Sequence, residues 1–599
     1  CWPVEWLAED LPLEDKDSSA LDRHLEALYN ESLAVPGVFE HFAKQPRGIQ
    51  ALELPAPEPP QRESVLIFSD ALGFCRRIVD AAPEGRVGTK EIVEGCEGLT
   101  QEDVRRLVES REGGWDLVIY GYGIDAPKSN AVMNVIEQQN AAVRLYFWLL
   151  QEIQRTEVTT TRLAVITRGV FAEDPDQHRK HGIQLITAAP LFGMSNSARL
   201  EMEQSIQYID MEWSPEECRG GAQGLFLRLA SEVFRQQTFG HNSVRVLSRG
   251  RYVLRRMHSA SYEAASREFV MPARGVIAIS GGNGALGLVM GNWLLDEAER
   301  QSASGFTIKF LSRSAKVSEP SLPLWKKVQA KAARMGIPVE QATCDFGSQQ
   351  ATEEFVKEMQ GSLTGFVHSA GVLRDQMLAN LSWEKFEEVF DSKHRGALYL
   401  HSALERHQNP GLSFLWLFSS ISVWGNMGQV NYSGSNAFLD ALARHRVARG
   451  RPGLAIQWGA WGEVGMASSM TDAMRQRALA GPYPFFSNSE ALHGLEVGLR
   501  TGLPNFSVLK LNPAVIGEMV RAADTASQCL TRNFEAAEIM PLPALPALER
   551  RHVYSALQAV RGPNREEPGR HRLVYEAYTQ GFVEEEEREW GEDFRTWSG

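Results

Sequence analysis

The segment Phe418–Asn436 carries side chains whose types and spacing suit the reduction of a carbonyl group. It reads FSSISVWGNMGQVNYSGSN: serines end an apolar run, Tyr432 follows about a dozen residues later, and Asn436 lies four residues beyond the tyrosine. A tyrosine can donate its proton to a carbonyl oxygen while hydride reaches the carbon, and a serine hydroxyl can hold that oxygen. A nearby lysine ammonium makes such a phenol a stronger acid. The pattern predicts a hydride-transfer site, although a tyrosine taken alone is more often a packing residue.

A glycine-rich turn predicts where a nucleotide cofactor binds. Ser280–Gly287 reads SGGNGALG, directly after the apolar run Val276–Ser280 and before a helical stretch. Glycines let the main chain approach a pyrophosphate, and the start of the helix offers free N–H groups. We therefore expect cofactor contacts from Gly281, Gly282, Asn283, Gly284, Ala285, Leu286 and Gly287.

Residues at the ends of later strands predict which cofactor binds. Leu311 is followed by Ser312, Arg313 and Ser314. An arginine here suits the 2′-phosphate of NADPH, whereas a carboxylate would suit NADH, so we expect NADPH. A surface arginine without a ligand is the plainer interpretation of Arg313. Further contacts are expected from the CDF and HSAGV strings, namely Asp345 and Phe346 near the adenine, and Ser369, Ala370 and Gly371 near the nicotinamide ribose.

Short apolar runs alternate with helical stretches twice along the chain. The first series includes Ser64–Phe68, Asp116–Tyr120 and Leu163–Thr167, and the second begins at Val276 and includes Gly365–His368 and Leu412–Phe418. Such alternation predicts parallel βαβ units. The length of 599 residues also exceeds one comfortable core. We expect an α/β protein with two Rossmann-like subdomains.

Composition narrows the class of protein further. The net charge of −13 disfavours a nucleic-acid partner, and no apolar run is long enough for a membrane span. The six cysteines are widely spaced, which argues against a disulfide framework or a zinc site and favours a reducing, cytoplasmic location. Because the chain begins with Cys1, we expect it to be cut from a longer polypeptide, so organellar targeting cannot be judged.

Residues 275–515 resemble the catalytic subdomain of the ketoreductases of polyketide synthases and animal-type fatty acid synthases, within the short-chain dehydrogenase/reductase superfamily. The resembling strings, in the family's order, are SGGNGALG, LSRS, CDF, HSAGVLRDQML, SKHRGALYLH, FSSISVWGNMGQVNYSGSNAFLDALARHRVARG and WGAWGEVGMA. The resemblance implies a doubly wound parallel sheet that binds NADPH and reduces a 3-oxoacyl group on an acyl carrier protein.

The resemblance also implies residue roles. The superfamily's usual lysine, four residues after the tyrosine, is replaced here by Asn436; synthase ketoreductases carry the lysine on the preceding helix, which matches Lys393. Tyr432 is then the acid, Lys393 tunes its acidity, Asn436 is a relay partner and Ser420 holds the oxyanion. The family's serine precedes the tyrosine by thirteen residues. Ser419 has that count, but Ser420 has the expected place at the strand end, so we choose Ser420 and infer a one-residue deletion nearby.

The first half resembles the structural subdomain of the same ketoreductases, a truncated, cofactor-free relative of the catalytic one. The resembling strings are WPVEW, RLAVITRG, APLFGMSNSARLE and QYIDMEW, and the turn SDALGF has only one glycine. We expect a structural subdomain over residues 1–262, a catalytic subdomain over 263–520, and a linker with an acidic tail over 521–599, with a helix near Ala547–Val560.

Product handedness and partners are the last expectations. The string Leu373-Arg374-Asp375 keeps the second aspartate of a D-alcohol signature, whereas Trp424, eight residues before the tyrosine, marks L-forming enzymes. We predict the D-alcohol, with Asp375, Trp424 and Gln429 controlling stereochemistry. Expected partners are an acyl carrier protein and other synthase domains. The alternatives are an inactive ketoreductase-like scaffold, or a free-standing reductase of small carbonyl compounds.

Two side-chain groups received structural interpretations. The basic cluster over 444–451, comprising Arg444, His445, Arg446, Arg449 and Arg451, is expected to be a solvated helix face, with contact to an acidic carrier protein as the weaker hypothesis. Trp458 and Trp461 are expected to belong to the core or to a pocket wall.

Overall fold

The computed structural model describes most of the chain between residues 62 and 512. The described residues are 2–9, 62–156, 160–215, 222–234, 243–248, 250–256, 268–464, 476, 479–512 and 515. The expected subdomain boundaries after residues 262 and 520, the helix near Ala547–Val560 and the acidic tail lie outside the described residues.

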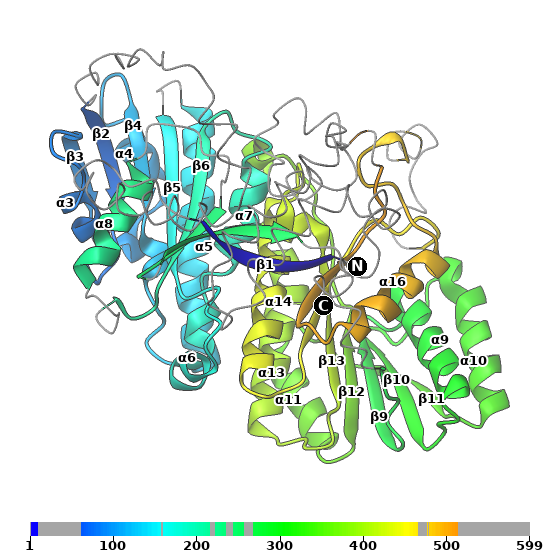
Figure 1. Ribbon diagram of the computed structural model, residues 1–599. Helices are drawn as coiled ribbons and strands as arrows, with labels where there is room; N and C mark the ends of the chain where they lie inside the picture. Colours follow the sequence, from blue (N-terminus) through cyan, green and yellow to red (C-terminus); the bar gives the residue numbers. More distant parts are fainter. Residues whose placement is uncertain are drawn as a thin grey trace, which may run out of the picture.

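The second half folds around seven parallel strands whose order is β11-β10-β9-β12-β13-β14-β15 (Figure 1). They are β9 (Gly275–Ser280), β10 (Phe306–Ser312), β11 (Val339–Thr343), β12 (Leu363–His368), β13 (Phe414–Ser420), β14 (Leu454–Trp458) and β15 (Asn505–Val508). The order reverses between β9 and β12, where the carboxyl ends of the strands leave a crevice that suits a ligand. The glycine-rich turn follows β9 and therefore lies at this switch point.

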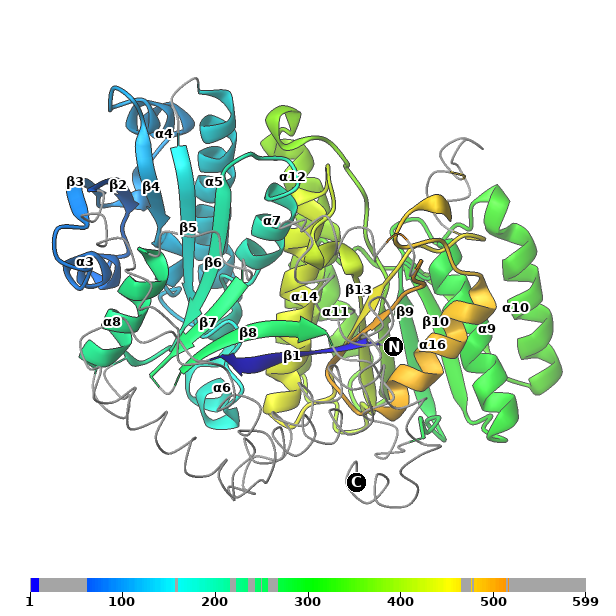
Figure 2. The same ribbon diagram turned by 45° about the horizontal axis from the view of Figure 1, so that its top comes forward.

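Helices cover both faces of this part of the sheet. They are α9 (Ala285–Arg300), α10 (Leu322–Met335), α11 (Gln349–Glu358), α12 (Trp383–Val389), α13 (Gly396–Arg406), α14 (Val430–Ala448) and α16 (Asn488–Arg500). Side chains of α9, α10 and α16 share one buried cluster with the strands, and those of α11, α13 and α14 share another. Figure 2 shows the ribbons of α9, α10 and α16 together at one end of the molecule. The strands are rich in Val, Ile, Leu and Phe because apolar layers enclose them from both sides.

The first half repeats this architecture. Its strands are β2 (Glu63–Phe68), β3 (Val87–Val93), β4 (Trp115–Tyr120), β5 (Thr160–Arg168), β6 (Ser205–Met211), β7 (Ser243–Leu247) and β8 (Gly250–Arg256), of which only β8 runs antiparallel to its neighbour. Its helices are α3 (Phe74–Asp80), α4 (Gln101–Val108), α5 (Val132–Arg155), α6 (Pro175–His181), α7 (Pro190–Ala198) and α8 (Ala222–Val233). The prediction of two Rossmann-like units with parallel sheets is confirmed.

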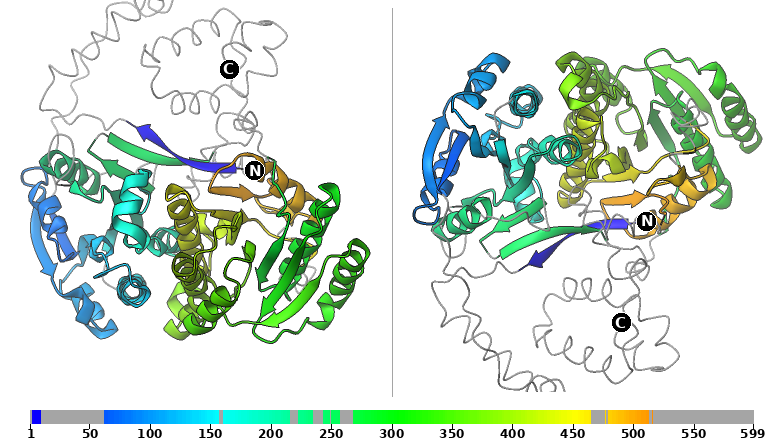
Figure 3. Two further views of the ribbon diagram at one scale, coloured as in Figure 1. Left: turned by 90° about the horizontal axis from the view of Figure 1, so that it is seen from below. Right: turned by 90° about the horizontal axis from the view of Figure 1, so that it is seen from above.

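Strand β1 (Trp2–Glu9) joins the two halves into one sheet of fifteen strands. Its first residues pair antiparallel with β15, and residues from Val4 to Glu9 pair antiparallel with β8. Figure 3 shows β1 and β8 side by side between the two halves. The N-terminal strand therefore belongs to both sheets, whereas the sequence predicted it only as the first strand of the structural unit.

Close packing of α7 on α14 fixes the first half against the second. A Cβ atom on Gly193 of α7 would lie 2.1 Å from the carbonyl oxygen of Ser433, so only glycine allows this approach of the two helices. Every residue of α7 is buried, including Asn196 and Ser197. Tyr432 precedes Ser433 on α14, so the first half packs directly behind the predicted catalytic turn.

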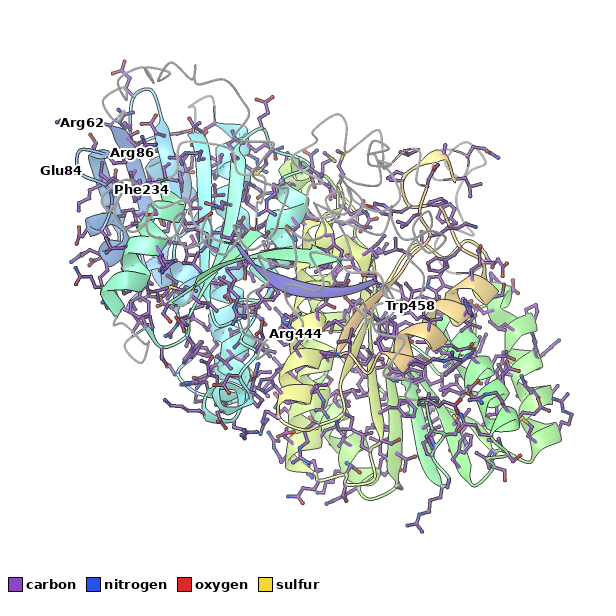
Figure 4. All side chains as sticks on the ribbon, viewed as in Figure 1. Arg62, Glu84, Arg86, Phe234, Arg444 and Trp458 are labelled. Atoms are coloured by element: carbon purple, nitrogen blue, oxygen red, sulfur yellow. The ribbon has the colours of Figure 1, made fainter. Side chains whose placement is uncertain are left out.

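The basic cluster is not a solvated helix face, and that expectation was wrong. Arg446 and His445 are almost completely buried. Arg446 donates to the carbonyl oxygen of Pro452 and lies 3.0 Å from the ring of His401. Arg444, which is labelled in Figure 4, lies over the ring of Phe171 from the first half, 4.7 Å from the ring centroid. His445 and Arg446 are buried because α14 is packed between the sheet of the second half and the first half.

The two remaining positions of that cluster are also engaged within the chain. Arg449 forms an ion pair with Glu405 at 3.0 Å, and Arg451 lies 3.7 Å from the same carboxylate. Trp458 and Trp461 are buried and pack against each other, as expected. Among the described helices, none combines the length and the apolar character that crossing a membrane demands.

Candidate active site

Lys393 and Tyr432 meet at the carboxyl edge of the catalytic sheet. Tyr432 lies in the first turn of α14, and Lys393 lies in the π-helical turn Phe390–Arg395 that precedes α13. The lysine Nζ donates to the tyrosine hydroxyl at 2.9 Å and lies 4.2 Å from the ring centroid. The lysine is almost fully buried, so its charge acts in a region of low dielectric. This pair combines a proton donor with a cation that favours the phenolate.

His368 holds the main chain of Lys393, and the sequence analysis assigned it no role. Its Nε2 lies 3.0 Å from the carbonyl oxygen of Lys393, and its Nδ1 lies 2.8 Å from the hydroxyl of Ser280. Burial lowers the pKa of His368 to about 4, so the ring is neutral at pH 7. Because a carbonyl only accepts, Nε2 donates to it and Nδ1 accepts from Ser280. The available signal was its position before the Ser369-Ala370-Gly371 string.

The two candidate serines occupy different environments at the end of β13. Ser420 is half-buried, and its Oγ accepts from the main-chain N–H of Ser422 at 3.2 Å. Ser419 is buried and donates to the carbonyl oxygen of Asn436 at 3.4 Å, beside Asp440. Successive strand residues point to opposite faces, so the two hydroxyls cannot serve the same site.

Asn436 lies behind Tyr432, one helical turn along α14. Its Nδ2 donates to the carbonyl oxygen of Tyr432 at 2.9 Å and to the hydroxyl of Ser422 at 3.1 Å. Its Oδ1 is buried and lacks a hydrogen-bond partner in the described part of the chain. No hydrogen bond among the described residues joins Asn436 to Lys393, so the structure shows the amide near the pair without direct contact.

The glycine turn is shaped for close approach of main chain to main chain. Gly281 has φ +67°, and a Cβ there would lie 2.9 Å from Ala370. A Cβ on Gly282 would lie 2.8 Å from the Cα of Phe310, and one on Gly287 would lie 2.6 Å from Gly282. Any side chain at these positions would displace a neighbouring strand end or the turn itself. The turn therefore sits beside the Ser369–Gly371 string, and α9 begins directly after Gly284, at Ala285 and Leu286.

The remaining cofactor candidates surround the same edge. Asn283 donates to Ser312 and accepts from Gln341, each at 2.6 Å. Arg313 and Ser314 are exposed after β10. Their position leaves the guanidinium accessible to a ligand.

The two residues of the CDF string differ in exposure. Asp345 is exposed, and its Oδ1 accepts from the N–H of Gly347 at 3.0 Å. Phe346 is buried against Phe366, so only its main chain is available to a cofactor.

Asp375 and Gln429 are joined by a hydrogen bond at the start of α14, the helix that carries Tyr432. The Nε2 of Gln429 donates to Asp375 at 2.8 Å, and the N–H of Gln376 donates to the carbonyl oxygen of Gly428 at 2.9 Å. Loss of hydration raises the pKa of the Asp375 carboxyl, and the bond from Gln429 partly offsets this. The loop after β12 and the loop before α14 are thereby joined.

Trp424 points away from these two residues. Its indole is buried, donates to the side chain of Gln457 at 3.0 Å, and packs edge-on against Phe192 of α7 with ring centroids 5.9 Å apart. The three residues predicted to control stereochemistry are therefore not one group, because Trp424 belongs to the contact with the first half.

The corresponding turn of the first half is filled by its own side chain. Asp70 accepts hydrogen bonds from the main-chain N–H groups of Phe74 and Cys75, each at 2.8 Å. These N–H groups begin α3, where a dinucleotide's phosphate would bind in a Rossmann unit. A carboxylate in that place agrees with the expectation that the first half binds no cofactor.

The doubly wound sheet, the glycine turn at its switch point and the Tyr432–Lys393 pair resemble the fold and site of the short-chain dehydrogenases/reductases. Within that class, residues 275–463 match the family model of the KR domain. This part of the chain is therefore similar to KR domains.

The curated relatives are named as synthases. Polyketide synthase GfsA from Streptomyces halstedii is 32% identical over 293 residues, covering 48% of this chain and 4% of the relative. Mellein synthase from Phaeosphaeria nodorum is 33% identical over 214 residues, covering 34% of this chain and 12% of the relative. The chain thus spans a small fraction of the length of these relatives.

Solved structures of ketoreductases share the fold. The first ketoreductase of the tylosin PKS is 24% identical, with a TM-score of 0.61 and coverage of 78% of this chain and 95% of that chain. A structure described as an A1-type ketoreductase is 21% identical, with a TM-score of 0.61 and coverage of 79% and 95%. The similarity extends beyond the KR domain into the first half.

Proposed function

We propose that this protein is an NADPH-dependent ketoreductase that converts a 3-oxoacyl group on an acyl carrier protein into the 3-hydroxyacyl group. The observation that carries the proposal is the 2.9 Å contact between Lys393 Nζ and the Tyr432 hydroxyl. The pair lies in the part of the chain that is similar to KR domains, at the same sheet edge as the glycine turn.

The residues of the glycine turn fit a dinucleotide. At several glycines of this turn a Cβ would collide with neighbouring main chain, so only a hydrogen atom fits. A main chain without side chains can approach a pyrophosphate closely. Gly281–Gly287 would hold the diphosphate, and Ser369–Gly371 would lie along the nicotinamide ribose. NADPH, when bound, supplies the hydride. We assign the 2′-phosphate to Arg313, which is exposed and follows β10 as this contact requires.

The chain's own residues complete the reduction. Ser420 donates a hydrogen bond to the ketone oxygen, and Tyr432 transfers its proton to that oxygen as the carbon receives hydride. Lys393 stabilises the phenolate that remains until a proton from solvent replaces the one transferred. Ser420 is favoured over Ser419 because its hydroxyl is the accessible one, whereas Ser419 faces Asn436 and Asp440. One hydride and one proton convert the ketone into the alcohol.

The partners follow from the relatives. The curated relatives are polyketide synthases, so we propose that the substrate arrives on the phosphopantetheine arm of a carrier protein and that other synthase domains act before and after this one. A cytoplasmic location belongs to the same proposal. The division into a structural unit over 1–262, a catalytic unit over 263–520 and a tail also stays a proposal.

Oxidation of NADPH tests the function directly. The wild type should consume NADPH with a 3-oxoacyl thioester, and Tyr432→Phe should lose most turnover while its Kd for NADPH stays nearly unchanged, because only the proton donor is removed. Tyr122→Phe, in the first half, is the matched control and should behave as wild type. A folded wild type that binds NADPH but reduces no 3-oxoacyl substrate would instead indicate an inactive scaffold.

A further inference from the structure

Glu201, a residue of the non-catalytic half, holds both loops that border the catalytic groove. It follows α7, and each of its carboxylate oxygens accepts one main-chain N–H from the other half of the protein. Oε1 accepts from Gly428 at 2.8 Å, and Oε2 accepts from Leu378 at 2.6 Å. One carboxylate therefore bridges the loop before α14 and the loop after β12.

These two loops carry Asp375 and Gln429, two of the residues predicted to control stereochemistry. Asp375 lies three residues before Leu378, and Gln429 directly follows Gly428. The Asp375–Gln429 bond and the Gln376–Gly428 main-chain bond join the loops beside Tyr432, but both bonds lie within the catalytic half. Glu201 fixes the joined loops from outside.

Neighbouring residues of the first half support the carboxylate. Gln154 of α5 donates to the carbonyl oxygen of Glu201 at 2.9 Å, and Gln151 donates to the carbonyl oxygen of Leu378 at 2.8 Å. Both main-chain polar groups of Leu378 are thus bound by the first half. Gln151 is buried, so this contact is a permanent part of the packing.

A second contact fixes the loop before α14 in the same way. The Oγ of Ser197 accepts from the N–H of Asn426 at 3.1 Å and donates to the hydroxyl of Ser433 at 2.7 Å. A Cβ on Gly425 would lie 2.7 Å from the carbonyl oxygen of Asn196, so main chain lies directly against main chain. The loop between Gly425 and Gly428 therefore takes its position from α7 and the turn that follows it.

We propose that Glu201 is a positioning residue that sets the width and shape of the substrate groove, and so controls which face of the ketone meets the hydride. This inference rests on the proposed ketoreductase function. A carboxylate that accepts two main-chain N–H groups makes charge-assisted bonds stronger than neutral ones. Reaction rates depend steeply on placement, since a shift of about 1 Å can cost on the order of a hundredfold. Loosening both loops at once would alter the fit of the acyl chain without touching the cofactor turn.

Glu201→Gln tests the proposal, with Glu203→Gln as the matched control. The amide keeps one acceptor oxygen but turns an NH₂ group toward the other N–H, so one of the two bonds is lost. Glu203 lies two residues away and is exposed. We expect Glu201→Gln to raise KM for a 3-oxoacyl thioester about tenfold, as loss of one charge-assisted bond implies, and to lower the excess of the major 3-hydroxyacyl enantiomer. The Kd for NADPH should stay within about twofold, because the glycine turn is untouched.

Two further measurements separate the outcomes. Glu201→Asp keeps the negative charge on a shorter side chain, and we expect an intermediate loss of enantiomeric excess. The thermal unfolding midpoint shows whether each variant folds. If Glu201→Gln does not fold, Glu201→Asp provides the test. An active wild type whose Glu201 variants match Glu203→Gln in KM and product ratio would overturn the role of Glu201. An equal loss of NADPH binding and turnover in the Glu201 variants would show general destabilisation, and this result would also overturn the positioning role of Glu201. An inactive wild type would instead refute the proposed function.

Discussion

The imidazole of His368 donates to the main-chain carbonyl of Lys393 at 3.0 Å, at the π-helical turn that presents the lysine to Tyr432. In a π-helical turn the regular α-helical hydrogen bonds are interrupted, and such turns are frequent at functional sites. The same ring accepts from Ser280 at the end of β9. His368 therefore couples the end of β9, where the glycine turn begins, to the backbone that carries Lys393.

Replacing His368 tests this coupling. His368→Leu removes the hydrogen bonds to Ser280 and to the carbonyl oxygen of Lys393. Each bond contributes about 0.5–1.5 kcal/mol. We therefore expect kcat to fall about tenfold. His368→Gln retains a donor and an acceptor and should recover part of the loss. Steady-state kinetics with saturating NADPH measures both variants. Wild-type kcat in the leucine variant would show that the Lys393 turn needs no such support.

The oxyanion contact is tested by a pair of serine variants. Ser420→Ala should lower kcat by about a hundredfold or more, as loss of an oxyanion donor typically does. Ser419→Ala should have a smaller effect on kcat, because that hydroxyl faces the carbonyl oxygen of Asn436. Side-by-side turnover assays decide the assignment. A larger loss in the Ser419 variant would reverse it.

Arg313 should decide the preference for NADPH. Arg313→Ala should weaken NADPH binding by roughly tenfold to a hundredfold, the usual effect of losing a charge-assisted contact to phosphate. The Kd for NADH should barely change, since NADH lacks the 2′-phosphate. Titration of both cofactors by fluorescence measures the difference, and a uniform loss for the two would contradict the assignment.

The buried histidines between α6 and α14 predict acid-sensitive stability. His178 and His445 lie with their Nδ1 atoms 3.0 Å apart, and burial lowers the pKa of both, that of His445 to about 2. Below pH 6.5 these histidines bind protons in the unfolded chain but stay neutral in the folded chain. The free energy of unfolding therefore decreases as the pH is lowered. The charges of His178, Arg449 and Arg446 lower the pKa of His445 further.

The slope of that loss identifies its source. Between pH 6.5 and 5, the free energy of unfolding of His445→Gln should decrease less steeply with falling pH than that of the wild type. The two slopes should differ by up to about 1.4 kcal/mol per pH unit. His493→Gln, at an exposed position, is the control and should keep the wild-type slope. Denaturant unfolding at several pH values measures this. Parallel curves for wild type and His445→Gln would refute the explanation.

Local signals predicted most of the fold, and tertiary contacts account for what they missed. The apolar runs at β2, β4, β5, β9 and β13 predicted strands because two-sided burial leaves a continuous hydrophobic sequence. Strand β3 was missed because its burial is partial and its sequence, VGTKEIV, is polar. The double pairing of β1 had no local signal, since pairing partners are distant in sequence.

The site shows the same division. Spacing alone suggested Tyr432 and a serine, whereas Lys393 came only from the resemblance, because nothing local tells that a π-helical turn brings its Nζ to the tyrosine. The two hydrogen bonds accepted by Glu201 could not be predicted from the sequence either, because their donors are main-chain N–H groups about 180 and 230 residues away. The prediction that Arg446 is exposed was wrong for a related reason. An arginine-rich helix face predicts exposure to solvent, and its sequence does not show that another part of the chain covers it.

The last prediction concerns the handedness of the product, where Asp375 and Trp424 favour opposite outcomes. Trp424 is buried between Gln457 and Phe192, so it shapes the contact with the first half. Asp375 is exposed and accepts a hydrogen bond from Gln429 at the start of α14, the helix that carries Tyr432. We therefore expect the D-alcohol, with a phosphopantetheine arm that enters on the side of Asp375.

Chiral chromatography of the 3-hydroxyacyl product measures this outcome. Asp375→Asn should reduce the excess of the D-product, because an amide facing Gln429 presents either its oxygen or its NH₂ and no longer holds one loop geometry. Trp424→Phe preserves an aromatic ring against Phe192 and should leave the product ratio close to that of the wild type. A predominantly L product from the wild type, or a ratio that changes with Trp424 and not with Asp375, would show that the tryptophan governs how the substrate enters the groove.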